Sequence, residues 1–183
     1  MLEVMLRYRC QPVGIQFDMA KAYNTLRTGP VERHVRRFVW RFCPSDPWAD
    51  YALDRVHFGD ACAVTQLEVA KDIVADAGAH LDPQAAKRLK EDVYVDDGLS
   101  GGTADQVNRF VGFKNGDTGY NGTFSQILAL GNFRIKAFAI SGQKLSEESD
   151  LLGDKILGYQ YDLESDVMGV KFPINLSKKR RSV

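Results

Sequence analysis

Residues 93–102 read Val-Tyr-Val-Asp-Asp-Gly-Leu-Ser-Gly-Gly, and this stretch decides how the rest of the chain is interpreted. The apolar run from Val93 to Val95 leads into Asp96 and Asp97, and glycines lead out, so we expect a tight hairpin over residues 92–101. Two adjacent ionised carboxylates repel each other, and a fold tolerates them best when a cation lies between them. Ordinary turn chemistry explains the pair equally well, because Asp and Gly dominate hairpin turns.

A third carboxylate, Asp18, stands at the end of a short apolar strand expected over residues 13–17. A turn into a helix over residues 20–26 follows it, which is a common way to present a metal ligand. Beside the Asp96-Asp97 turn, Asp18 would complete a site for two hard cations. With no metal bound, mutual repulsion should raise the pKa of at least one of these three carboxyl groups. Mg²⁺ suits such a site because it binds a few protein carboxylates together with substrate phosphates, and Mn²⁺ is the alternative ion.

Two of these stretches resemble catalytic motifs of reverse transcriptases. Residues 17–23, Phe-Asp-Met-Ala-Lys-Ala-Tyr, resemble the first motif, and residues 94–97 resemble the third. Further segments resemble, in the same order, the polymerases of BEL/Pao-type LTR retrotransposons. These are residues 37–41 (the strand after the first motif), 56–59 (the second motif), 131–136 (the fourth) and 157–161 (the Leu-Gly turn of the primer grip). The likeness runs from about residue 13 to about residue 176.

The resemblance implies an RNA-directed DNA polymerase that transfers a nucleotide from a dNTP to a primer 3′-hydroxyl on an RNA or DNA template. Asp18, Asp96 and Asp97 would hold two Mg²⁺ ions, and Lys136 would donate a proton to the leaving pyrophosphate. Tyr23 resembles the aromatic gate that excludes a 2′-hydroxyl, although core packing of Tyr23 is an equal reading. The remaining implied site residues bind substrate (Met19, through its carbonyl, Tyr23, Phe58, Gly59, Tyr94) or grip the primer (Leu157, Gly158, Tyr159).

The chain departs from the family pattern at three places. Val64 stands where the second motif usually carries a proline, and Asp60 puts a negative charge near the expected template path unless it caps the helix. In the fourth motif, the family lysine falls either on Lys136 or one residue later, where this chain has Ala137. These differences fit either divergence within the branch or decay of an inactive copy.

The implied fold is α+β, a polymerase palm with a ferredoxin-like split βαβ sheet and helices on one face. We expect residues 1–12 to be a remnant of a fingers region, extended over residues 1–9. Residues 13–176 would be the palm with its primer-grip hairpin, and 177–183 a basic truncated tail. Fingers and thumb would be largely missing. Other expected strands cover 36–42, 51–56, 132–141, 155–162 and 167–173. Expected helices cover 61–77, 82–90, 103–113 and 123–130, and the last three are capped by Asp82, Thr103 and Thr123.

Composition sets outer bounds. The chain has 183 residues, of which 44% are apolar, enough for one domain with a real core. It carries no run apolar enough to span a bilayer, so we expect no membrane partner. Three scattered cysteines argue against a disulfide framework and favour a reducing compartment, the cytoplasm within a retroelement particle, with the nucleus as the alternative. Net charge is zero, but arginines cluster between residues 27 and 41, either to contact phosphate or as a solvated face.

Three interpretations of the function remain open. The chain is either an active polymerase domain, whose gene also encodes protease, ribonuclease H and integrase domains, or an inactive retroelement-derived fragment with at most nucleic-acid binding. A nucleotide cyclase-type palm also binds triphosphates with two metals. It leaves the Leu-Gly-Tyr turn at 157–159 and the Arg-Phe-Val-Trp-Arg strand at 37–41 unexplained.

Overall fold

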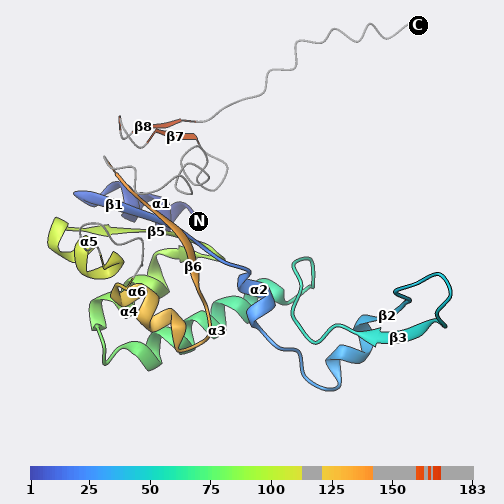
Figure 1. Ribbon diagram of the computed structural model, residues 1–183. Coiled ribbons are helices and arrows are strands. Elements are labelled where there is room, and N and C mark those ends of the chain that lie inside the picture. The colour runs from blue at the N-terminus through green and yellow to red at the C-terminus, as the bar shows by residue number, and fades with distance from the viewer. Residues whose placement is uncertain (113–120, 142–159, 163–164, 166, 170–183) are drawn as a thin grey trace, which may run out of the picture.

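A four-stranded antiparallel sheet forms the centre of the molecule (Figure 1). This computed structural model describes residues 1–112, 121–141, 160–162, 165 and 167–169. The strands stand in the order β4-β5-β1-β6, with bounds β1 (Val13–Met19), β4 (Val93–Tyr94), β5 (Asp97–Gly102) and β6 (Ile135–Ile140). Along the chain the sheet is built from a strand, helices, two strands, helices and a final strand, which is the predicted split βαβ order. The α+β class is confirmed.

Strand β1 lies inside the sheet, between β5 and β6, and its successive side chains point to opposite faces of the sheet. Ile15, Phe17 and Met19 are buried in the main core. The ring of Phe17 lies 5.6 Å from the rings of both Phe124 and Phe138, measured between centroids. This packing fixes the register of β1, since a slip of one residue would turn the apolar set to the other face and move Asp18 away from its neighbours.

Four helices cover the face of the sheet that carries Phe17 (Figure 1). They are α3 (Ala63–Gly78), α4 (Pro83–Glu91), α5 (Ala104–Val111) and α6 (Thr123–Ala129). Asp82 caps α4, with its side chain accepting from the amides of Gln84 and Ala85, and Thr103 forms a capping box with Gln106. Both caps are as predicted. The predicted Thr123 cap is wrong: Gly122 is the N-cap of α6, and the Thr123 hydroxyl bonds Asp82 instead.

The predicted extended segment at the N-terminus is wrong, because Leu2–Arg9 forms helix α1. Its buried residues Val4, Met5 and Tyr8 follow helical spacing and give α1 one apolar face. That face packs on the side of the sheet opposite the other helices: a Cβ on Gly14 would lie 2.7 Å from the Tyr8 ring. Helices therefore cover both faces, and the expectation of helices on one face alone is also wrong.

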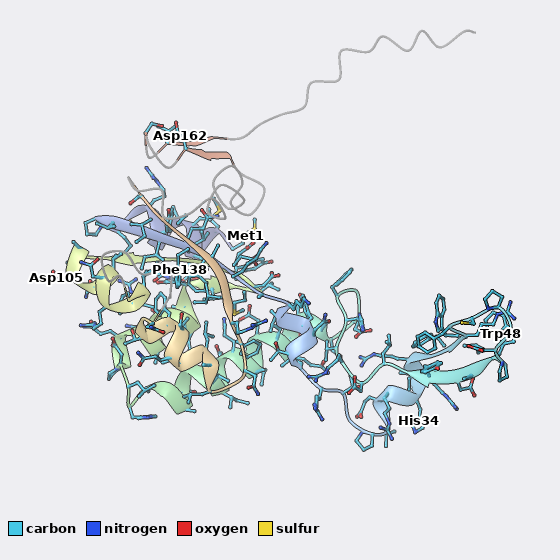
Figure 2. All side chains as sticks on the ribbon, viewed as in Figure 1. Met1, His34, Trp48, Asp105, Phe138 and Asp162 are labelled. Atoms are coloured by element: carbon cyan, nitrogen blue, oxygen red, sulfur yellow. The ribbon has the colours of Figure 1, made fainter. Side chains whose placement is uncertain are left out.

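An arm between β1 and α3 projects away from the sheet (Figures 1 and 2). After the short helix α2 (Ala22–Thr25) it contains a 3₁₀ turn (Glu32–Arg36) and a hairpin of β2 (Arg37–Trp40) and β3 (Ala49–Ala52). The predicted strands are present but shorter, and β3 begins two residues earlier than expected. The arm's large apolar side chains are exposed, among them Val35, Trp40, Phe42 and Trp48.

The last described elements are β7 (Gln160–Asp162) and β8 (Val167–Gly169), which pair antiparallel within the predicted final hairpin. The remaining residues of its two predicted strands, 155–159 and 170–173, lie outside the described residues. All three cysteines are free and exposed. In the described part of the chain, no helix combines the length and the apolar character that crossing a bilayer requires.

Candidate functional site

Three carboxylates, two from strands and one from a turn, converge at one end of the sheet. Asp18 on β1 stands directly opposite Asp97 on β5 in the antiparallel ladder, and Asp96 immediately precedes Asp97 in the turn. The amide of Met19 donates to the carbonyl of Asp96 at 3.0 Å, which ties the turn to the end of β1. Side chains of residues paired in this way project from the same face, so Asp18 and Asp97 are close neighbours. The convergence predicted from sequence is therefore present.

The turn that carries Asp96 has an unusual backbone. Tyr94 pairs with Asp97, so Val95 and Asp96 form a two-residue turn. Val95 has φ of +62°, a left-handed conformation that a β-branched side chain seldom adopts. Such backbone strain costs on the order of 1–3 kcal/mol, and it persists only where surrounding contacts hold it.

Burial and mutual repulsion perturb the carboxyl groups. The pKa of Asp97 is raised from 3.8 to about 6, first by burial and then by the charges of Asp96 and Asp18. The pKa of Asp18 is also raised, by burial and then by Asp96, while Lys136 opposes the shift. The sequence predicted a raised pKa from repulsion; the rise is present, but burial is its larger cause. Like charges directly across a ladder destabilise the sheet, so this arrangement is costly for the fold.

Lys136 is the cation nearest to the carboxylates in the described residues. Its Nζ lies 3.8 Å from Oδ2 of Asp18, and about half of its side chain is exposed. At that position β6 departs from regular pairing: Asp18 pairs with Ala137, and Met19 with Ile135. This bulge leaves Lys136 without a direct partner on β1, so the lysine rather than Ala137 reaches the carboxylates.

The carboxylates suit a hard cation chemically. They supply oxygen ligands, two of them carry a raised pKa that a bound cation would lower, and one lysine ion pair balances little of their charge. As the side chains stand, no three His, Cys, Asp or Glu residues among those described are arranged as a ready-made metal site.

Two tyrosines border the carboxylates. Tyr23 on α2 is half-buried and packs against the core, and its pKa is raised by burial and then by the charges of Asp96, Glu68 and Tyr94. Tyr23 therefore contacts the core, as expected of a packing residue, and also lies near the carboxylate of Asp96, as expected of a substrate gate. Tyr94 is 39% exposed, and its cross-strand partner is Asp97.

Phe58 and Gly59 lie in the turn between the arm and α3. Phe58 is 81% exposed, and Gly59 has φ of +94° with no heavy atom near its missing side chain. Asp60 accepts a hydrogen bond from the amide of His57 and pairs with Arg36 at 2.9 Å, so it stabilises this turn instead of capping α3. Arg36 thus offsets the negative charge of Asp60, the residue that departs from the family pattern. The primer-grip residues Leu157, Gly158 and Tyr159 lie outside the described residues.

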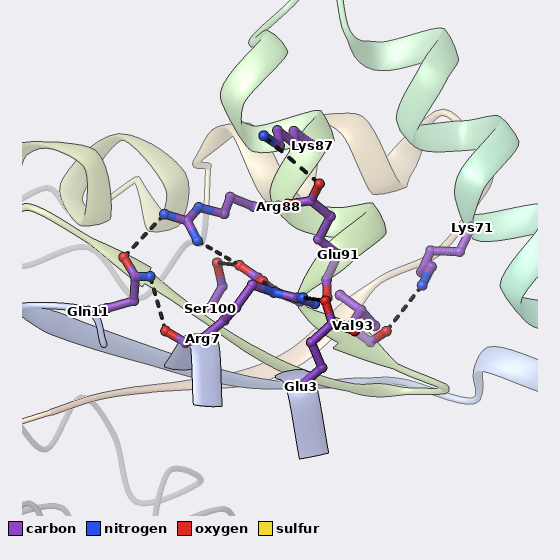
Figure 3. A network of polar contacts seen from close by, with 10 residues as sticks. Glu3, Arg7, Gln11, Lys71, Lys87, Arg88, Glu91, Val93 and Ser100 are labelled. Carbon is purple, nitrogen blue, oxygen red and sulfur yellow. Dashed lines mark hydrogen bonds and ion pairs between the residues drawn. The ribbon is translucent and has the colours of Figure 1, made fainter. Parts of the chain in front are cut away.

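Sequence reasoning missed the residue that anchors the hairpin base. Asp92 is 1% exposed, and its carboxylate accepts from Arg7 Nε at 3.0 Å, Arg88 Nη1 at 3.2 Å and Ser100 Oγ at 2.9 Å (Figure 3). Arg88 and Asp92 are four residues apart at the end of α4, a spacing that sequence could have flagged. The bond from Arg7 on α1 spans 85 positions and depends on the fold.

Comparisons with known proteins add no identity. No protein-family model matches the sequence, and no curated protein is significantly similar to it. The functional argument therefore rests on the motifs and on the geometry of the carboxylates.

Proposed function

We propose that this chain is the palm of an RNA-directed DNA polymerase of the BEL/Pao retrotransposon type. The observation that carries the proposal is Asp18 directly opposite Asp97, beside the Asp96 turn, in a sheet with split βαβ order. A turn bearing two carboxylates has a simple structural explanation; a third carboxylate across the ladder does not. Three carboxylates that repel one another at one end of a sheet destabilise the fold unless a cation binds between them.

Asp18, Asp96 and Asp97 would hold two Mg²⁺ ions, or Mn²⁺, which when bound supply activation of a primer 3′-hydroxyl and neutralisation of a triphosphate. The chain's own residues would then position the substrates. Lys136, whose half-exposed side chain lies beside Asp18, would give a proton to the leaving pyrophosphate. Tyr23 would lie against the sugar.

Residues of the second motif would act at a distance from the carboxylates. Phe58 presents an exposed ring on which a base could stack, and Gly59 lets a strand backbone approach closely because it has no side chain. Template and primer are therefore the proposed partners, with protease, ribonuclease H and integrase domains elsewhere in the full gene.

The arm bears on the activity of the isolated chain. Its exposed apolar side chains on a two-stranded hairpin indicate a surface that is covered in a larger protein. Polymerase fingers and thumb hold the triphosphate and the primer duplex, and electrostatic positioning provides most of the rate in phosphoryl transfer. We therefore expect the 183-residue chain alone to extend primers several orders of magnitude more slowly than the protein with its flanking regions.

Primer extension on an RNA template with Mg²⁺ or Mn²⁺ tests the proposal. The chain should be assayed alone and within the full product of its gene, the extended protein. The extended protein should be active, Asp96→Asn should abolish that activity, and Asp46→Asn in the exposed arm should leave it unchanged. Efficient extension by the isolated chain would refute the truncation argument, and activity retained with Asp96→Asn would refute the metal assignment. Inactivity of the extended protein would favour the alternative of an inactive retroelement-derived fragment.

A further inference from the structure

Two side chains from α3 bond the backbone on either side of Tyr94. Glu68 Oε1 accepts the amide of Val95 at 2.8 Å, and Lys71 Nζ donates to the carbonyl of Val93 at 3.1 Å. Lys71 also donates to the other carboxylate oxygen of Glu68, so the two side chains act as one unit. Figure 3 shows Lys71 reaching from α3 to Val93.

The backbone groups bonded by this pair are those that the sheet leaves open. β4 is an edge strand with β5 on one side only. Tyr94 pairs with Asp97 directly beside the turn, and along an antiparallel strand the N–H and C=O groups of successive residues point alternately toward and away from the partner strand. The N–H and C=O groups of Val93 and Val95 therefore point away from β5. Such edge groups need a partner when they are buried. Glu68 and Lys71 supply those partners at the turn that carries Asp96.

A buried ammonium paired with a half-buried carboxylate is an expensive way to pack a helix against a strand. Lys71 is 1% exposed, and an apolar residue of similar length would fill the same space without desolvating a charge. The charged pair gains directional bonds that an apolar residue lacks. One of these bonds is to Val95, whose φ of +62° needs outside support.

Glu68 also belongs to the electrostatic surroundings of the site, since its charge acts on Tyr23 together with that of Asp96. An unpaired carboxylate here would add to the repulsion among the aspartates. The Lys71 ammonium offsets that charge while leaving Oε1 free to hold Val95.

We propose that Glu68, supported by Lys71, is a positioning residue that holds the Val95-Asp96 turn in the conformation that brings Asp96 and Asp97 beside Asp18. Its effect on a cation rests on the proposed function, whereas its effect on the turn does not. The role is indirect: Glu68 acts through the Val95 amide.

Hydrogen exchange of the Val95 amide and Mn²⁺ binding, both measured on the full chain, test the two parts separately. Glu68→Ala should speed exchange at Val95 about tenfold, the effect of losing one hydrogen bond, with little change at core amides. Mn²⁺ affinity should fall about 10–100-fold, as when an outer partner of a metal ligand is lost. Glu68→Gln, which keeps an oxygen acceptor, should retain most of the protection at Val95. Glu91→Ala on α4, whose side chain pairs with Lys87, is the matched control and should change neither quantity.

Unchanged exchange at Val95 in Glu68→Ala, or equal acceleration at all core amides, would overturn the positioning role. If Glu68→Ala does not fold, Lys71→Met decides: it should also speed exchange at Val95, and unchanged exchange there would refute the proposal. Absence of Mn²⁺ binding in the unsubstituted chain would refute the metal site of the proposed function, while exchange at Val95 still decides whether Glu68 holds the turn.

Discussion

Replacing Asp97 with Asn should stabilise the folded chain at neutral pH. The pKa of Asp97 is about 6 in the fold and 3.8 ordinarily, a difference of about 2 units. At about 1.4 kcal/mol per unit this corresponds to about 3 kcal/mol for a fully shielded group. Because the side chain is half-buried, we expect solvent screening to reduce the effect to about 1–2 kcal/mol. Asn keeps the shape and backbone pairing of Asp97 and removes only the charge.

The direction with pH follows from proton binding. Between pH 4 and pH 6, about the two pKa values, folded Asp97 holds more proton than the unfolded chain, so stability falls as pH rises through this window. The Asn variant does not lose stability in this way. Its gain in free energy of unfolding over the unsubstituted chain should therefore be complete above about pH 7 and absent near pH 4. At pH 8 the substitution should raise the melting temperature by about 2–8 °C.

Urea and thermal unfolding at pH 4 and pH 8 measure this effect, with Asp105→Asn on an exposed helix turn as a control that should change little. Mg²⁺ should stabilise the unsubstituted chain at pH 8 by binding the folded state, and should stabilise the Asn variant less. If Asp97→Asn were less stable than the unsubstituted chain at pH 8, or if it gained equal stability at both pH values, the ionised Asp97 carboxylate would not be destabilising the fold.

Three further perturbations test the fold. Asp92→Asn should lower the free energy of unfolding in urea by about 2–4 kcal/mol, because a buried carboxylate that accepts three hydrogen bonds loses its charge. A decrease below about 1 kcal/mol would contradict this. Gly112→Ala should destabilise more than Gly59→Ala: both have positive φ, but a Cβ at Gly112 would lie 2.1 Å from the Gly122 nitrogen, whereas Gly59 has open space. Equal melting temperatures of the two variants would refute this comparison. Replacing residues 29–53 by a short Gly-Ser linker should leave core amide protection intact, because Thr28 and Asp54 already bond across the base of the arm; global loss of protection would show that the arm supports the core.

Much of the fold could be predicted because its signals are local. The cap at Asp82, the capping box at Thr103 and the hairpin around Asp96 each depend on residues within a few positions of one another. Asp18, near the end of β1, and Asp97, at the start of β5, were likewise visible as carboxylates close to short apolar runs. The N-terminal helix was missed because its mixed composition fits a strand or a helix, and burial of Tyr8 against Gly14 selects the helix.

The sequence by itself determined which residue types stand at the strand ends, and hence which side chains are candidates for binding a cation. Only the tertiary structure decided their environment. The pKa of Asp97 depends on burial by the assembled sheet, the left-handed turn at Val95 depends on Glu68 from a helix 27 positions away, and Asp92 is held by an arginine 85 positions away. Short-range sterics and hydrogen bonds are written in neighbouring residues, whereas desolvation and long-range charge pairing exist only once distant segments exclude water together.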